Sequence, residues 1–573
     1  MVYELLKQEH PKLTENEYLT RLCELVRKQS TLDRPALVRP LTTEQEVEQS
    51  FHGTHLYTKG CVMTNMIRDL VSEFEFRTGI RRYLRKNAYR SVSRQELWES
   101  MPAYADHGAE QQRLSDVMEG WLVNEGIPEI TVSRNYHNDM ITVTQRRCDD
   151  HYHKAFLDSG EGTTAVPPSP SISILSRRDE LRKPRHTPKP TDLWNVPFTY
   201  TFGSVKSSEG QVVRQFWLRN RSVSFVDVEL SPSQAVLANP NWGYPYRVNY
   251  DITNWKMLAR LLHQSYQEIP AKSRIQLLVD AETFLAHSDL PQLFVYILGY
   301  LSDETDLGVA LIGMSAIHRL FDSFRGVNLP ELQLYLAPAV AQLDRLLDDS
   351  QTDTELAALW LIDPSRLVPL LQNLRKNPRH CHKLLQAKRW MNFPNSLNDD
   401  VHKQVTAVCH YFFTHNVTRE ESLLEAQLKS RGGQWSTAVQ LAACSHSERV
   451  VKLAARQIVA TKNAAIFAST LQSDFSLHYN ARFRKALWSQ IGKMTTAERR
   501  LLFSVDEVKP QPASRILVHS IRSLDELSQV RTLVEDWGPK MSKHLEYIER
   551  HLRWQNRMSQ TTLREFFSNR ATI

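Results

Sequence analysis

Long hydrophobic runs are missing from this sequence. A transmembrane helix needs about 20 consecutive apolar residues, and no stretch of the 573 residues approaches that length. The longest candidates, at 293–301 and 307–317, are separated by the acidic residues Asp303, Glu304 and Asp306. The first ten residues do not form a signal peptide. As written, the sequence therefore predicts a chain without a membrane segment that stays in the cytoplasm.

Cysteine is scarce, and the six cysteines are too scattered to form the disulfide framework of a small secreted domain. They are Cys23, Cys61, Cys148, Cys381, Cys409 and Cys444. Two glycosylation sequons, at Asn220 and Asn416, point instead to the secretory pathway. Such triplets arise often by chance and have no effect in the cytoplasm, so they are used only if the chain enters that pathway.

A large excess of charge of one sign is also missing. The net charge is +7, and 24% charged with 41% hydrophobic residues is ordinary for a soluble globular protein. Basic side chains are densest between 177 and 189, where prolines interrupt them, and this composition is typical of a solvated loop. A nucleic-acid-binding role would rest on this loop and the basic isoelectric point alone. We therefore expect no nucleic-acid partner.

Several catalytic motifs are absent as well. The chain contains no G-x-S-x-G nucleophile elbow, no phosphate-binding glycine loop and no dinucleotide fingerprint. Two clusters of potential metal ligands lack the separated pairs that close a tetrahedral zinc site. They are Cys148, Asp149, Asp150, His151 and His153, and His380, Cys381 and His382. We interpret both as exposed polar residues and expect no metal and no cofactor in this chain.

The periodicity of the apolar residues predicts a multidomain, mainly α-helical protein with three regions. Residues 1–127 have helical spacing, and Thr14 with Glu17, Thr43 with Glu46 and Ser93 with Glu96 form capping boxes. The clearest helix of this region carries apolar side chains on a 3.6-residue period, at Met63, Met66, Ile67, Leu70 and Val71.

The other two regions differ in period. Apolar residues in 128–251 alternate with a period of two, which predicts a β-sandwich with a long polar loop at 148–192. The alternating sets are Ile130/Val132, Ile141/Val143, Phe198/Tyr200/Phe202 and Val226/Val228/Leu230. Residues 252–573 show helical faces such as Val450, Leu453 and Ala454, joined by short loops. Helix pairs of this kind bury their faces by stacking, so we expect a solenoid of the HEAT or armadillo type.

The block Tyr57-Thr58-Lys59-Gly60 opens the clearest helix, and other landmarks follow it in order: Trp194-Asn195-Val196-Pro197, Tyr246-Arg247-Val248-Asn249-Tyr250-Asp251 and Asn254-Trp255. In this order they resemble the gluzincin zinc aminopeptidases, the family of aminopeptidase N and the endoplasmic-reticulum aminopeptidases. The resemblance covers nearly the whole chain. It implies that residues 1–127 are the C-terminal helical half of a thermolysin-like catalytic domain, and that the solenoid is a bowl that receives the peptide.

The motifs that carry the chemistry of this family are missing. The family binds zinc through an H-E-x-x-H helix and a downstream glutamate, and it grips the substrate amino group with a G-x-M-E-N segment. Neither motif occurs here, and the chain contains no His-Glu dipeptide. By resemblance, Tyr57 is the tyrosine that stabilises the transition state through a hydrogen bond to the oxyanion. One such donor accelerates a reaction by about 10²–10³, whereas the zinc of the complete family enzyme generates the nucleophile itself.

The block around Tyr57 also has a purely structural interpretation. Tyr57 would then be a buried tyrosine retained by ancestry. We expect Gly60 to let the start of the helix pack closely, and Lys59 to meet a neighbouring carboxylate. The glutamine that the family has after Trp121 is replaced at Asn124, which we interpret as drift.

Two functional hypotheses follow. In the first, the chain is a pseudoenzyme that is inactive alone and binds peptides or a protein partner. In the second, it is the C-terminal part of an active zinc aminopeptidase, which removes N-terminal residues from peptides, and a second chain or a longer isoform supplies the missing half. The protein would then be at the cell surface or at a membrane. Loss of the upper half should expose the apolar face of the helix that contains Met63 and Val71, which would require a partner.

Overall fold

The computed structural model describes two compact units of a mainly α-helical chain. One comprises residues up to Gly313 and the other begins at Met314, so the division lies within helix α12 (Leu307–Ser323). The described residues are mainly 54–107, 110–148, 193–202, 213–286, 288–324, 329–349, 447–462, 480–503, 520–535 and 539–569, with shorter pieces between 22 and 47, at 327, between 425 and 445, and at 517 and 537. Within these residues, no helix combines the length and the apolar character that a membrane span requires.

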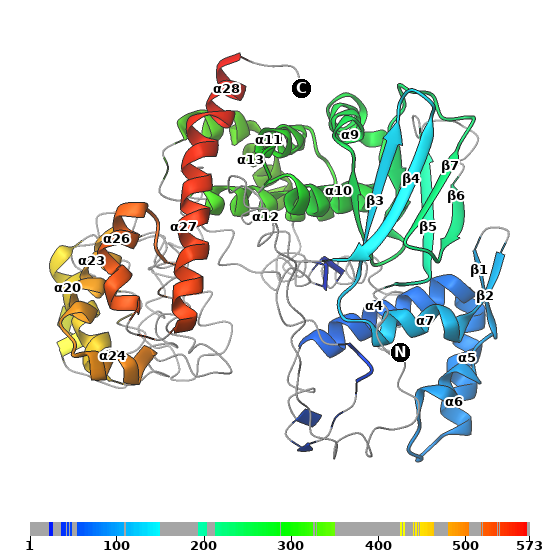
Figure 1. The fold of residues 1–573 in the computed structure, drawn as a ribbon, viewed down its shortest axis with the longest axis horizontal. Helices are drawn as coiled ribbons and strands as arrows, with labels where there is room; N and C mark the ends of the chain where they lie inside the picture. Colours follow the sequence, from blue (N-terminus) through cyan, green and yellow to red (C-terminus); the bar gives the residue numbers. More distant parts are fainter. Residues whose placement is uncertain are drawn as a thin grey trace, which may run out of the picture. The chain divides into compact units, whose positions relative to one another are not determined.

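The first unit begins with helices and one hairpin: α4 (Thr54–Val71), α5 (Glu73–Lys86), α6 (Arg94–Trp98), β1 (Tyr104–His107), β2 (Glu110–Arg113) and α7 (Leu114–Val123) (Figure 1). The capping boxes at Ser93 and Thr43 are confirmed, because each pair exchanges side-chain and backbone hydrogen bonds. The box at Thr14 and Glu17 lies outside the described residues. The antiparallel β1–β2 hairpin corrects the expectation that this region is helical throughout.

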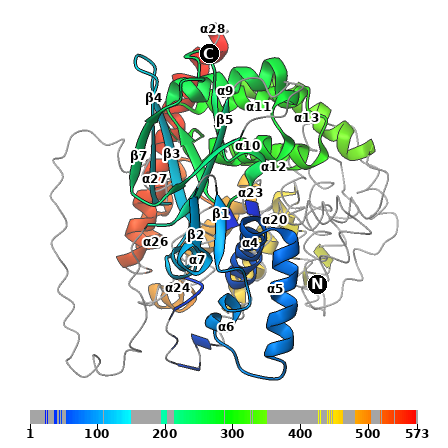
Figure 2. The same ribbon diagram turned by 90° about the vertical axis from the view of Figure 1, so that its right-hand side faces the viewer.

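The apolar face of α4 is buried. Met63, Met66, Ile67, Leu70 and Val71 are each exposed by no more than 8%. Helix α5 and strand β1 pack against α4, and Figure 2 shows α5 lying beside it (Figure 2). The expectation that this face is exposed is therefore wrong, because elements of the same chain cover it.

Two sheets follow α7. One has the order β7-β4-β3-β9 and is built from β3 (Pro128–Asn135), β4 (Met140–Arg147), β7 (Ser222–Val226) and β9 (Arg247–Tyr250), with β3 and β9 parallel. The other has the order β6-β5-β8 and is built from β5 (Val196–Phe202), β6 (Arg214–Leu218) and β8 (Val236–Ala238). The strands predicted at Ile130/Val132 and Ile141/Val143 are confirmed, and all four side chains are buried.

Aromatic side chains join the two sheets. The ring centroid of Phe225 on β7 lies 5.5 Å from that of Tyr200 on β5 and 5.4 Å from that of Phe216 on β6. In the first sheet, the side-chain amide of Gln145 on β4 donates hydrogen bonds to the carbonyls of Trp194 and Leu218, at 3.0 and 3.2 Å. These contacts fix the second sheet against the first.

The strand expected through Val228 ends earlier. Strand β7 ends at Val226, and Val228 is 94% exposed, so the prediction for residues 227–230 is wrong. The reason lies in Asp227, whose carboxylate accepts hydrogen bonds from the Tyr200 hydroxyl at 2.8 Å and from the Glu229 amide at 3.1 Å. This local hydrogen bonding turns the chain away from the sheet.

The chain changes from strand to helix at Asp251, where the spacing of the apolar residues changes from a period of two to a helical period. Strand β9 ends at Tyr250, and the Asp251 carboxylate caps α9 (Ile252–Ser265) by accepting the Asn254 amide at 2.9 Å. Helix α10 (Ala271–Phe284) then packs on β9, because the Asp280 carboxylate accepts the Val248 amide at 3.0 Å. Helix α11 (Pro291–Gly299) completes this part of the unit.

Helices are the regular elements of the second unit in its described residues. Its helices are α13 (Pro330–Asp349), α20 (Glu448–Ala460), α23 (Ala481–Gly492), α24 (Thr496–Phe503), α26 (Leu524–Glu535), α27 (Pro539–Gln560) and α28 (Thr562–Asn569) (Figure 1). One hydrophobic core of this unit contains Trp537, whose ring stacks on Phe503 and Trp488, with ring centroids 4.4 and 6.1 Å apart. The apolar face predicted on α20 is confirmed, because Val450 and Ala454 are buried.

Candidate functional site

Tyr57 lies in the first part of α4, and its side chain is 59% exposed. The interpretation of Tyr57 as a buried tyrosine is therefore wrong. Its neighbours in the sequence, Thr58 and Lys59, are buried, because successive residues of a helix point in different directions. The Tyr57 hydroxyl makes no hydrogen bond with any residue that the structure describes.

Lys59 anchors the helix that carries Tyr57. Its amine is buried and donates hydrogen bonds to the backbone carbonyls of Gly126, at 3.0 Å, and Asn124, at 3.3 Å. Its partners are thus carbonyl oxygens of the segment between α7 and β3, and not the carboxylate that we expected. Burial removes water from the amine and lowers the pKa of Lys59 to about 8, and the nearby charge of Glu125 opposes this shift only in part.

The segment that receives Lys59 is itself held in place. Gly126 has a φ of 73°, a conformation that favours glycine. The buried side-chain amide of Asn124 donates to the Leu193 carbonyl at 2.7 Å, and the Trp121 indole donates to the Asn195 carbonyl at 3.2 Å. Asn124 therefore has a structural role in this chain.

The glycine of the block does not have the expected role. A Cβ atom added to Gly60 would meet no atom within 4 Å, so close packing does not require glycine there. The close approach occurs at Gly79 on α5, where an added Cβ would lie 2.6 Å from the Met101 sulfur and 2.9 Å from the Ser100 carbonyl oxygen. The physical reason is that Gly60 faces open space, whereas Gly79 is buried against the segment after α6.

Among the side chains that the structure describes, those around Tyr57 do not fit a zinc ion. The contacts of Lys59 are a buried ammonium with two backbone carbonyls, whereas protein zinc sites use thiolate, imidazole and carboxylate ligands. Elsewhere in the described part of the chain, no three His, Cys, Asp or Glu side chains gather as a possible metal site. Of the two clusters considered from the sequence, Cys148 is buried, and Asp149, Asp150, His151, His153, His380, Cys381 and His382 lie outside the described residues.

The arrangement can therefore offer one phenol donor to a developing negative charge, and no described group beside it would generate a nucleophile. Sequence reasoning missed the contact between Lys59 and the 124–126 segment. The only signal for it was the turn composition Asn124-Glu125-Gly126 before β3, which marks a tight turn but does not say which side chain binds its carbonyls.

Comparison with known proteins gives one family. Residues 1–121 match the Peptidase family M1 domain. The chain is 22% identical over 471 residues to endoplasmic reticulum aminopeptidase 2 of Bos taurus, an alignment that covers 78% of this chain and 45% of that protein. It is 23% identical over 284 residues to aminopeptidase N of Haemonchus contortus, covering 48% of this chain and 26% of the relative.

A third relative, thyrotropin-releasing hormone-degrading ectoenzyme of Rattus norvegicus, is 24% identical over 278 residues, which are 48% of this chain and 24% of the relative. The chain thus spans less than half the length of each of these proteins. With the ordered landmarks around Tyr57, these matches show that the chain is a relative of the zinc metallo-aminopeptidases, the family of aminopeptidase N and the endoplasmic reticulum aminopeptidases, without the zinc-binding motif of that family.

Proposed function

We propose that this chain is a pseudoenzyme of the aminopeptidase family, inactive by itself, that binds peptides or a protein partner. In this proposal it consists of the helical remnant of a thermolysin-like catalytic domain, a β-sandwich and a HEAT-like solenoid. Neither nucleic acid nor a bound cofactor is part of its function, and the protein works in the cytoplasm unless it forms part of a longer membrane-associated relative.

The single observation that carries the proposal is the environment of Tyr57. Tyr57 is exposed, yet the sequence has no H-E-x-x-H motif and the described residues around it offer no ligand set for zinc. A lone oxyanion donor contributes about 10²–10³ in rate. Peptide hydrolysis by this family also needs an activated water, which a tyrosine does not supply.

A second observation supports a role without a complementing half. The apolar face of α4 is buried within the chain, so the helical remnant does not present a large apolar surface there. A rigid helical surface, in contrast to a metal site, does not depend on the missing motifs. Peptide or protein binding is therefore the function that the chain can keep without the zinc-binding and amino-group-binding motifs.

Hydrolysis of amino-acid aminocoumarin substrates tests the proposal. The purified chain is assayed alone and again with an added N-terminal half of an active relative. We expect no turnover in either mixture, and binding of the chain to immobilised peptides in both. Turnover by the chain alone would overturn the proposal.

The alternative function, the C-terminal part of a working zinc aminopeptidase, is favoured by one feature of the site. Tyr57 is exposed, its hydroxyl makes no hydrogen bond with a described residue, and it is the residue to which the resemblance assigns the role of oxyanion donor. This alternative expects turnover only after the N-terminal half is added, and it expects the added activity to depend on Tyr57. The same assay therefore separates the two functions.

A further inference from the structure

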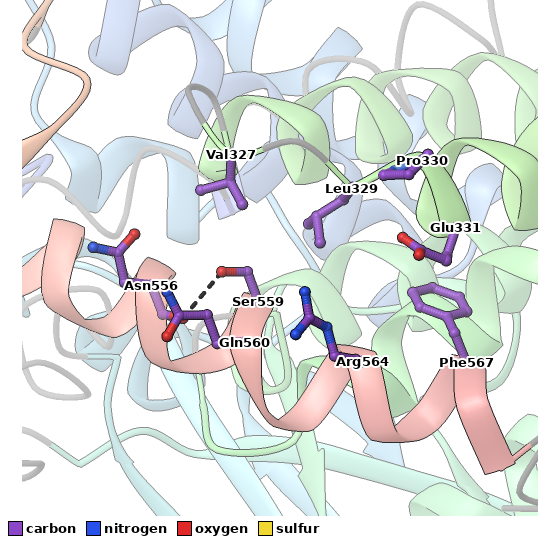
Figure 3. Close-up of a pocket in the computed structure, with 9 residues that line it drawn as sticks. All are labelled: Val327, Leu329, Pro330, Glu331, Asn556, Ser559, Gln560, Arg564 and Phe567. Carbon is purple, nitrogen blue, oxygen red and sulfur yellow. Dashed lines mark hydrogen bonds between the residues drawn. The ribbon is translucent and has the colours of Figure 1, made fainter.

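A cavity of about 460 Å³ lies within the second unit, between the start of α13, the end of α27 and α28. Figure 3 shows its lining side chains converging from these helices and from the segment before α13 (Figure 3). This volume is within the range of about 300–1,000 Å³ that is typical of small-molecule sites in proteins. The cavity therefore suits a small ligand better than a long extended peptide.

Aromatic contacts hold the walls of this cavity. The ring of Tyr335 on α13 lies 5.7 Å from Phe566 and 5.8 Å from Phe567 on α28. Before α13, the ring of Phe324 lies 5.4 Å from Trp554 on α27. These ring contacts join α13 to α28, and the segment before α13 to α27, so the walls of the cavity pack against one another.

The lining is divided by chemistry. The apolar part consists of Val327, Leu329, Pro330 and Phe567, and the neutral polar part consists of Asn556, Ser559 and Gln560. Ser559 is buried, and its hydroxyl donates to the Asn556 carbonyl at 3.0 Å. The cavity can thus receive an apolar side chain on one side and polar groups on the other.

Two opposite charges line the cavity without pairing. Glu331 on α13 and Arg564 on α28 make no ion pair and no side-chain hydrogen bond with any described residue. Both side chains are exposed, in contrast to the largely buried ion pair of Arg484 with Glu526, at 3.2 Å, in the same unit. An unpaired carboxylate and an unpaired guanidinium in one cavity are complementary to a ligand that carries both an ammonium and a carboxylate group.

The start of α13 adds hydrogen-bond donors for the carboxylate of such a ligand. The Gln333 amide donates to the Leu329 carbonyl at 3.2 Å, so the earlier amides of the helix have no partner within it. Unpaired amides at a helix start favour a bound carboxylate. Leu329 and Pro330 form the side of the cavity that Arg564 faces in Figure 3.

We propose that this cavity binds a short zwitterionic peptide, a dipeptide or tripeptide with an apolar side chain. Arg564 and the start of α13 bind its terminal carboxylate, Glu331 binds its terminal ammonium, and Leu329 and Phe567 contact the apolar side chain. This inference rests on the proposed function, because it assigns a ligand to a peptide-binding chain. It goes beyond that function by assigning the site to residues of the second unit.

Calorimetric titration with leucyl-leucine tests the inference. The full chain should bind the peptide with free termini, and binding should weaken at least about tenfold when the peptide is N-acetylated or C-amidated. In Glu331→Gln the N-acetylated and free peptides should bind equally, and in Arg564→Gln the amidated and free peptides should bind equally. The matched controls Glu565→Gln and Arg557→Gln alter exposed residues that do not line the cavity, and they should bind as the unaltered chain does.

The possible results separate this inference from the proposed function. Absence of leucyl-leucine binding by an inactive chain that still binds longer peptides would overturn the cavity assignment and leave the proposed function standing. Equal binding of the free, acetylated and amidated peptides by the unaltered chain would also overturn it, without any variant. Turnover by the chain alone would overturn the proposed function. The dependence of binding on the two terminal charges would still show whether the cavity binds a zwitterionic peptide.

Discussion

The amine of Lys59 donates a hydrogen bond to the carbonyl of Gly126 at 3.0 Å, and this contact joins α4 to the turn that leads into β3. Because Lys59 is buried while Tyr57 is exposed, the same contact fixes which face of α4 presents the tyrosine to solvent. The anchor of the candidate site is thus a buried lysine bound by backbone carbonyls.

Lys59 makes stability depend on pH in the alkaline range. Its folded pKa of about 8 lies below its ordinary value of 10.5, so between these values the unfolded chain binds more protons than the folded chain. The contribution of Lys59 to the free energy of unfolding therefore rises as the pH rises from about 8 to about 10.5. Urea unfolding of the unaltered chain and of Lys59→Met across this range should show a steeper rise in the unaltered chain. The same pH slope in both would contradict the buried, charged amine.

Tyr57→Phe should leave stability nearly unchanged. The hydroxyl is exposed and unpartnered among the described residues, and substitutions of this kind usually change the free energy of unfolding by no more than about 0.5 kcal/mol. Urea unfolding measures this. A loss above about 1 kcal/mol would show that the tyrosine belongs to the core. If an added N-terminal half restores turnover, the same variant should lower that turnover by about 10²–10³.

Two glycines give a matched test of packing around the site. Gly79→Ala should destabilise the chain by about 1–3 kcal/mol, because the new methyl group would overlap the Met101 sulfur and the Ser100 carbonyl. Gly60→Ala lies in a helix and meets no atom within 4 Å, so it should stabilise by up to about 1 kcal/mol. Thermal unfolding midpoints of the two variants should therefore move in opposite directions. A lower unfolding midpoint for Gly60→Ala would contradict this and would support the close packing at Gly60 that was expected from the sequence.

Glu304→Ala should be one of the most damaging single changes in the first unit. The Glu304 carboxylate receives two hydrogen bonds from Arg274, both at 2.9 Å, and one from the Tyr300 hydroxyl at 3.2 Å, and all three side chains are buried. Removing one partner of such a pair leaves a buried charge and costs about 3–5 kcal/mol.

The control for this change is Glu99→Ala. Glu99 pairs with Lys86 at 3.1 Å on the surface of the same unit, and such pairs contribute up to about 1 kcal/mol. Chemical denaturation followed by tryptophan fluorescence compares the two variants. Equal losses would contradict the distinction between the buried and the exposed ion pair.

The parts of the fold that follow from local patterns were predictable. The alternation at Ile130 and Val132 identifies β3, and Ser93 with Glu96 identifies the start of α6, because period and capping act over a few residues. The β1–β2 hairpin was not predictable in this way, because its sequence, Tyr-Ala-Asp-His and Glu-Gln-Gln-Arg, has no alternation of apolar residues.

Contacts across long sequence separations account for the remaining differences. The partner of Lys59 is 67 residues away, and the position of that turn depends on the contacts of Asn124 and Trp121 with residues 193–195. The cavity unites Glu331 with Arg564 across more than two hundred positions of the chain. No local pattern encodes such a juxtaposition, whereas Tyr57 became a candidate only because its block resembles an ordered landmark of a known family.

The most direct test of the central claim is the zinc content of the purified chain after equilibration with zinc and removal of the excess, measured together with aminocoumarin hydrolysis. The account predicts neither stoichiometric zinc nor turnover. One tightly bound zinc per chain together with turnover would contradict it, and would show that the chain contains a complete metal site.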